Sequence, residues 1–216
     1  MATYKPGPFG PFTGKIGTVV GTKWKKLNVA RGVPSKSGKP PVLAQLEQRA
    51  KFALITQFLS NHGDLINLGF QRPSGNVTPM NVAVKYHLQN AVTGIYPDYT
   101  IDYKRVLFSK GTGSIQNGYN LKMVQEADRV IQITWEIESF ESKNTLPTDS
   151  IYIILYAPEI NQFAAVFGGS PRSSLKRKMN VSRSFEGLKA HSWILFVSAD
   201  QKQVSATQYM GEMTII

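Results

Sequence analysis

The chain has 216 residues, no cysteine and a formal net charge of +11. This length is sufficient for one large domain or two small ones with a buried core, and the lack of cysteine excludes disulfides, thiolate metal sites and thiol nucleophiles. No run approaches the roughly 20 apolar residues that span a bilayer, so the sequence predicts no transmembrane segment. The N-terminus also lacks the apolar core of a signal peptide. We therefore expect a cytoplasmic location, or a virion or non-classically released protein.

The positive charge is concentrated at the N-terminus. Residues 1–51 contain ten lysines and arginines and one acidic residue, Glu47, which leaves 15 basic and 13 acidic residues for residues 52–216. This asymmetry indicates an anionic partner, such as a nucleic acid, a membrane surface or an acidic face of another protein, or else a solvated basic arm. We expect another copy of the chain as partner, with nucleic acid as the alternative. No small-molecule substrate is indicated.

Residues 1–40 are predicted to form a basic, Gly/Pro-rich extended arm. Glycines interrupt every apolar run, and only residues 16–20 and 22–24 are typical of short strands. Such an arm buries too little apolar area to fold alone, so we expect it to dock on its own C-terminal domain or on a neighbouring subunit. The candidate subunit contacts in it are apolar: Phe9, Phe12, Ile16, Val19 and Val20.

Residues 41–95 are predicted to be helical. Apolar residues recur at spacings of three and four from Val42 to Phe58, which is the pattern of an amphipathic helix. A short second helix is expected over residues 64–68. Thr78 as N-cap and Pro79 at the first helical position predict the start of a third helix, and Gly94 its end.

Residues 96–216 are predicted to form a β-sandwich domain. Apolar and polar residues alternate over residues 131–138, as in a half-buried strand, whereas residues 151–156 and 193–197 are apolar on both faces and typical of central strands. About seven short strands follow one another without intervening helices, which favours an antiparallel, immunoglobulin-like β-sandwich. The predicted fold class is therefore mainly β with a helical N-terminal part (α+β).

Two basic clusters are candidate contacts for an anion or a nucleic acid. In the arm, an aromatic residue lies between cations, a combination that can stack on bases while it contacts phosphates. In the β domain, basic residues crowd one strand and its turn from Arg172 to Arg183, although lysine on an edge strand also protects a sheet against aggregation. The candidate residues are Lys15, Lys23, Trp24, Lys25, Lys26, Arg31, Lys176, Arg177 and Lys178.

The sequence predicts no catalytic residue, no cofactor and no metal site. The three histidines, His62, His87 and His191, lack the spacing of a metal-binding face, and we interpret each as structural. Residues 32–40 resemble a phosphate-binding loop, but five residues separate the glycines instead of four, and a proline stands where a metal-binding hydroxyl is required.

Acidic residues at the end of one strand offer a weak alternative. Glu136, Glu138 and Glu141 could supply the carboxylate pair of a glycoside hydrolase. Glu136 and Glu138 fall on the solvent side of an amphipathic strand, which is the ordinary place for such residues. We therefore rank an enzyme acting on carbohydrate below the other functions.

Several segments resemble an uncharacterised protein family widespread in Bacteroidota. The similarity lies in GPFGPFTGKIGTVVG at residues 7–21, in QLEQRAKF at residues 45–52, in NAVTG at residues 90–94 and in Ile101-Asp102-Tyr103. The resemblance implies a bacterial or phage origin. The family has no assigned activity, so no functional residue is implied.

Together these observations favour a non-enzymatic structural or assembly protein. In this interpretation the arm packs on neighbouring subunits of a homo-oligomer, as in a virion component or a filament. The alternative is a nucleic-acid-binding protein that uses the charge of the basic arm.

Overall fold

The computed structural model describes the whole chain except residues 1, 8–9, 36–37, 72–76, 114 and 138–143. The chain divides into two compact units, Met1–Leu46 and Glu47–Ile216. The boundary lies six residues after the expected end of the arm at residue 40. The helical region and the β-sandwich region, which the sequence separates at residue 95, lie almost entirely in the second unit.

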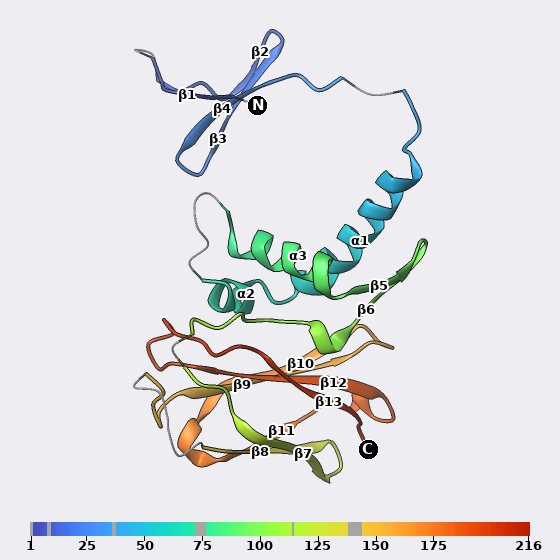
Figure 1. Cartoon of the computed structure of the whole chain (residues 1–216), viewed down its shortest axis with the longest axis vertical. Coiled ribbons are helices and arrows are strands. Elements are labelled where there is room, and N and C mark those ends of the chain that lie inside the picture. Colours follow the sequence, from blue (N-terminus) through green and yellow to red (C-terminus); the bar gives the residue numbers. More distant parts are fainter. Residues whose placement is uncertain (1, 8–9, 36–37, 72–76, 114, 138–143) are drawn as a thin grey trace. The chain divides into compact units, whose positions relative to one another are not determined.

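The first unit contains a small antiparallel sheet, drawn in blue in Figure 1. Its strand order is β1-β4-β3-β2. The expected extended arm with two short strands is thus more structured than its glycines suggested. Two-residue turns at Gly17-Thr18 and Lys25-Lys26 let β2 pair with β3 and β3 with β4, and β1 adds to the edge of β4. The strands are β1 (Ala2–Tyr4), β2 (Gly14–Ile16), β3 (Val19–Trp24) and β4 (Leu27–Gly32).

The three predicted helices are confirmed as α1 (Leu43–Ser60), α2 (Gly63–Gly69) and α3 (Pro79–Asn90). Thr78 caps α3, since its hydroxyl accepts a 3.2 Å hydrogen bond from the backbone N–H of Asn81. The predicted end of this helix at Gly94 is wrong, because α3 ends four residues earlier.

A hairpin that the sequence did not reveal follows α3. It is formed by β5 (Val92–Ile95) and β6 (Asp98–Ile101). Gly94 lies in β5 with a φ of 91°, and a Cβ atom there would meet the carbonyl oxygen of Asp98 at 2.4 Å. The glycine therefore serves the hairpin and not a helix end.

Seven strands form two antiparallel sheets, of order β10-β9-β12-β13 and β11-β8-β7. Chain neighbours such as β8 and β9, or β10 and β11, lie in different sheets, so the sheets form an immunoglobulin-like sandwich, as predicted. Gly168 and Gly169, both with positive φ, form an irregularity within β10. The strands are β7 (Tyr119–Ala127), β8 (Val130–Glu136), β9 (Ser150–Ala157), β10 (Gln162–Pro171), β11 (Lys176–Asn180), β12 (Lys189–Val197) and β13 (Gln208–Thr214).

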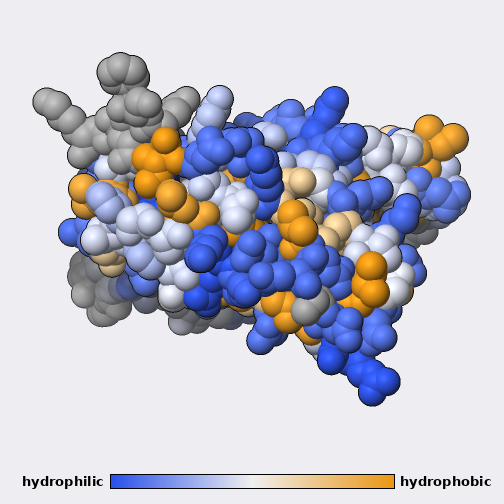
Figure 2. Space-filling view, turned by 90° about the horizontal axis from the view of Figure 1, so that it is seen from below, coloured by the Kyte–Doolittle hydropathy of each residue, from blue (hydrophilic) through white to orange (hydrophobic). Residues whose placement is uncertain are grey.

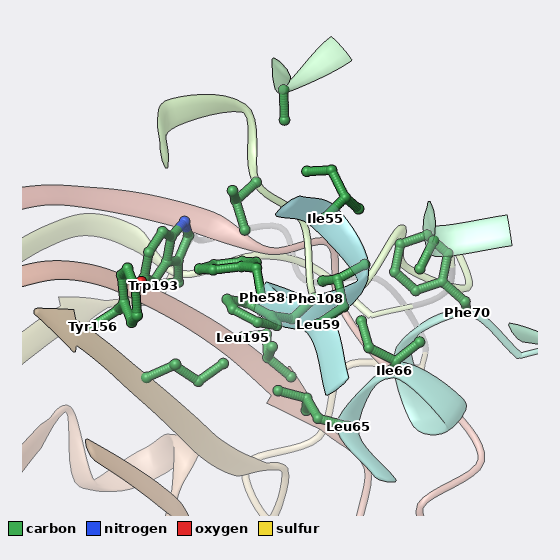
Figure 3. Packing of buried hydrophobic residues seen from close by; sticks show 14 of the residues in the cluster. Ile55, Phe58, Leu59, Leu65, Ile66, Phe70, Phe108, Tyr156, Trp193 and Leu195 are labelled. Atoms are coloured by element: carbon green, nitrogen blue, oxygen red, sulfur yellow. The ribbon is translucent and has the colours of Figure 1, made fainter. Parts of the chain in front are cut away.

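The four-stranded sheet is the middle layer of the second unit, with helices on one face and the three-stranded sheet on the other (Figure 1). On the helical side, Phe58 of α1 packs with Tyr156 and Trp193 of the central strands (Figure 3). On the other side, Ile153 and Phe196 face the three-stranded sheet. Both central strands are therefore buried on both faces, as their apolar runs predicted.

The outer face of the three-stranded sheet carries mostly hydrophilic side chains. Figure 2, seen from the side of this sheet, shows hydrophobic residues only in small separate groups. Tyr119, Val124 and Leu175 are examples of exposed hydrophobic residues on these strands and their connections. Scattered apolar residues of this kind are ordinary on a protein surface.

Candidate interaction surface

The register of the N-terminal sheet sorts its basic residues onto two faces. Lys15 of β2 pairs with Val20 of β3, and Val20 pairs with Arg31 of β4. Residues directly opposite each other in a sheet point to the same side, and so do residues two or four positions apart in one strand. Lys15, Arg31 and Trp24 therefore share one face, while Lys23 lies on the other.

The turn between β3 and β4 presents an aromatic residue beside cations. Trp24 is 44% exposed, and the ammonium group of Lys25 lies 5.3 Å from the centre of its ring. Lys25 takes a φ of 53°, which lets two residues close the hairpin. Lys26, the second residue of the turn, is exposed. The turn thus offers a cation–π pair and a second cation to a partner.

The candidate subunit contacts fall into two groups. The ring of Phe12 stacks on that of Tyr4, with the ring centres 5.4 Å apart, and Phe12 also covers Gly21. Phe12 therefore belongs to the packing of the sheet itself. Ile16 and Val19 pair across the β2–β3 turn and are 60% and 37% exposed. Val20 is half-buried, and Phe9 lies outside the described residues.

The basic cluster of β11 is largely engaged within its own unit. Along β11, Met179 is buried while Lys176 and Lys178 are exposed. The guanidinium group of Arg177 donates hydrogen bonds to the Gly169 carbonyl at 3.1 Å and to the Ser170 hydroxyl at 2.8 Å. Lys178 forms an ion pair with Glu126 of β7.

The first two histidines are held by their neighbours in the second unit. His62 is buried between Phe108 and Phe163, with ring centres at 5.3 and 4.1 Å, and burial lowers its pKa to about 4. The Nε2 atom of His87 accepts the backbone N–H of Leu107 at 3.1 Å, so its Nδ1 carries the proton and donates to the Ala83 carbonyl at 2.7 Å. Burial also lowers the pKa of His87.

The third histidine lies among tyrosines at the end of the four-stranded sheet. The Nδ1 atom of His191 lies 2.8 Å from the hydroxyl of Tyr209, and its ring stacks on Tyr103 at 4.2 Å. Burial lowers its pKa, and the nearby carboxylate of Glu212 opposes this effect. Within the part of the chain that the structure covers, no group of three His, Asp or Glu residues could hold a metal ion.

At the end of β8, the residues that the structure describes include no pair of carboxylates. Glu136 is exposed and accepts a 2.6 Å hydrogen bond from the side chain of Asn120. Glu138 and Glu141 lie outside the described residues. None of the described helices is long and apolar enough to cross a membrane.

Residues 11–211 match the profile of one protein family. The chain belongs to DUF6266, a family of unknown function. A search of curated proteins found no significant match. Among solved structures, the chain is similar to the fibronectin type III domain of human collagen alpha-1(XX) chain, with a TM-score of 0.35 and 16% identity over 50% of this chain and 91% of that one. We assign the sandwich fold of this DUF6266 protein from its strand order and its buried core, and not from this similarity.

One residue of the predicted basic cluster has a different role in this DUF6266 protein. Arg172 is only 1% exposed. Its guanidinium group donates hydrogen bonds to the carbonyl oxygens of Gln116 and Asn117 at 2.9 and 2.8 Å, and it lies 4.5 Å from the centre of the Phe196 ring. These partners are more than 20 residues away in the chain, so no local pattern marks Arg172 as buried.

Proposed function

We propose that this DUF6266 protein is a non-enzymatic structural protein that assembles into a homo-oligomer, and that its N-terminal sheet packs on a neighbouring subunit. The observation that carries this proposal is the exposure of apolar side chains on a very small sheet. Among the described residues of the first unit, Val29 is the one buried hydrophobic side chain, whereas Ile16, Val19, Trp24 and Val33 are exposed.

The energetics of the first unit favour docking. Burying one valine contributes about 1.5–3 kcal/mol, whereas ordering the backbone costs about 1–2 kcal/mol for each residue. A single-layer sheet also has two outer strands, here β1 and β2, whose outward N–H and C=O groups can pair with another chain. A partner that covers these exposed apolar side chains and an open edge would supply the missing burial.

The proposal is tested by the mass of the full-length protein. After nuclease treatment, light scattering should give a defined oligomer, and images of the same sample should show a ring, a shell or a filament. Deletion of residues 2–30 should dissociate it. The double variant Ile16→Thr, Val19→Thr should weaken it, whereas Val124→Thr, an equally polar change at an exposed residue of β7, should not. A stable full-length monomer would refute the assembly function.

A second candidate function is nucleic-acid binding, because residues 1–46 contain eight lysines and arginines and no acidic residue. Single-stranded nucleic acids bind surfaces that combine cations with exposed aromatic rings, as on the face that carries Lys15, Trp24 and Arg31. Three phosphate contacts would reduce affinity about twentyfold between 50 and 200 mM salt.

The two faces of the sheet provide a matched test of this second function. Arg31→Glu and Lys23→Glu change the charge equally but on opposite faces. Fluorescence anisotropy with a labelled single-stranded oligonucleotide should show a larger loss for Arg31→Glu. Equal losses would indicate unspecific attraction, and no binding at low salt would exclude this function.

The bacterial or phage origin and the cytoplasmic or virion location stay predictions.

A further inference from the structure

A small cleft in the second unit combines apolar walls, aromatic rings and a carboxylate. It lies where α2 meets the edge of the four-stranded sheet and has a volume of 240 Å³. Leu65 is buried and Leu68 is half-buried, and both belong to α2. The residues that line the cleft are Asp64, Leu65, Leu68, Tyr152, Phe167 and Gln201.

The aromatic side of the cleft is open to solvent. Phe167 is 53% exposed, and its ring centre lies 5.2 Å from that of Tyr152 on the neighbouring strand. Phe167 directly precedes the irregularity at Gly168 and Gly169 in β10. An exposed phenylalanine beside a partly buried tyrosine offers ring faces to a ligand, and a ring face attracts a cation.

The carboxylate of the cleft has no partner within the described part of the chain. Asp64 is exposed and makes no ion pair or hydrogen bond there. Five other carboxylates of this unit are paired with nearby cations in the described part of the chain. These pairs are Asp102 with Arg105, Glu126 with Lys178, Glu186 with Arg183, Asp200 with Lys202 and Glu212 with Lys189. Asp64 is therefore available to a cation from outside the unit.

This chemistry fits a lysine side chain. The long methylene stem of lysine packs on apolar surface while its ammonium group stays at a polar rim. In this cleft the stem would lie on Leu65 and Leu68. The ammonium group would then meet the Asp64 carboxylate and the aromatic rings.

We propose that this cleft receives Lys26 of the β3–β4 turn from a second copy of the chain, an inference that rests on the assembly function proposed above. Charge complementarity favours an occupant from the first unit, since that unit carries eight basic residues and no acidic one. Lys26 is exposed in its turn, next to the exposed Trp24. Trp24 would pack against Phe167 as the lysine enters.

The proposed contact joins two different surfaces, a turn on one copy and a cleft on the next. Made in one direction from copy to copy, such a contact builds a closed ring or an open filament, and made reciprocally by two copies it gives a twofold dimer. Because the contact depends on charge, we expect assembly to weaken as the salt concentration rises.

The experiment is a charge swap in the full-length protein. Asp64→Lys and Lys26→Asp should each raise the concentration needed for assembly about tenfold or more. The double variant, which restores opposite charges, should return it to within about threefold of the wild type. Asp128→Lys, the same charge change in the β7–β8 turn, should have no such effect. Phe167→Ala tests the aromatic side independently, and sedimentation velocity measures all variants.

The outcomes separate this contact from the assembly function. A monomeric wild type would refute assembly, and the contact with it. If the wild type assembles and Asp64→Lys and Phe167→Ala assemble equally well, the contact is wrong while assembly stands. If both single variants dissociate and the double variant does not recover, the pairing of Lys26 with Asp64 is wrong. The pairing of Lys26 with Asp64 is established if both single variants lose assembly and the double variant regains it.

Discussion

The indole nitrogen of Trp135 donates a 2.8 Å hydrogen bond to the backbone carbonyl of Arg172. Trp135 belongs to β8 in the three-stranded sheet, whereas Arg172 directly follows β10 in the four-stranded sheet, so the bond ties the two layers of the sandwich together. The Arg172 side chain reaches further, to the carbonyls of Gln116 and Asn117 just before β7. A buried arginine thus links segments that are distant in the sequence.

Replacing Arg172 with methionine should strongly destabilise the second unit. The change leaves the carbonyl oxygens of Gln116 and Asn117 without these donors in the interior, and we expect the free energy of unfolding to fall by about 3 kcal/mol. Arg183→Met, at a side chain that is 87% exposed, should cost less than about 0.5 kcal/mol. Urea denaturation measures both variants, and equal stabilities would contradict the structural role of Arg172.

Local sequence patterns predicted much of the second unit. The three- and four-residue spacing before Phe58 is a property of one helix, and the alternation around Ile133 is a property of one strand. The apolar runs of β9 and β12 predicted burial on both faces, and the helices and the three-stranded sheet cover those faces. Such features depend on neighbours in the sequence, so they can be read without a structure.

Features that depend on distant partners were missed. Strands β1 and β4 exist because short segments of the arm pair with one another, and Phe12 covers Gly21 nine residues away. The cleft at Asp64 joins residues from α2, from β9 and β10, and from the turn that holds Gln201. No periodicity brings such residues together. The candidate site could therefore be predicted as a basic segment, but not as a sheet with two different faces.

Removal of the α3 cap should have a modest and local effect. The Thr78 hydroxyl accepts a hydrogen bond from the Asn81 N–H, and loss of such a cap typically costs about 1 kcal/mol. Thr78→Ala should therefore lower the free energy of unfolding by about this amount, while Thr78→Ser keeps the hydroxyl and should retain most of the stability. Chemical denaturation of Thr78→Ala and Thr78→Ser measures both free energies of unfolding. Identical denaturation curves would show that the cap contributes nothing.

The low pKa of His62 predicts a loss of stability in acid. Burial lowers this pKa from 6.5 to about 4, so the unfolded chain binds the proton at a higher pH than the folded protein does. The free energy of unfolding should therefore fall as the pH drops from about 6.5 to 4, by about 2 kcal/mol after allowance for partial solvation.

The variant His62→Phe isolates this contribution. Phenylalanine fits among Phe108 and Phe163 and does not titrate, so the variant should gain stability relative to the wild type at pH 4.5 but not at pH 8. His87 and His191 also have lowered pKa values, and the variant keeps their part of the pH dependence. Parallel stability curves for wild type and variant between pH 8 and 4 would show that His62 does not titrate in this way.

A methyl group at Gly21 should disrupt the N-terminal sheet. A Cβ atom at this position would lie 2.3 Å from the Phe12 ring and 2.6 Å from the Phe12 carbonyl oxygen, so the backbone of residue 12 must shift as well as its ring. We expect Gly21→Ala to cost the first unit about 1–3 kcal/mol. Gly32→Ala in β4 is the matched control, because nothing lies within 4 Å of the added atom.

Hydrogen exchange over residues 19–32 measures the local effect of both glycine variants, and sedimentation measures assembly in the same samples. Gly21→Ala should exchange faster and lose the oligomer, since the exposed side chains of the sheet no longer hold their places. Gly32→Ala should behave as the wild type in both respects. Faster exchange with an intact oligomer would mean that subunits recognise the first unit without its sheet, and the docking role of the folded sheet would then be wrong.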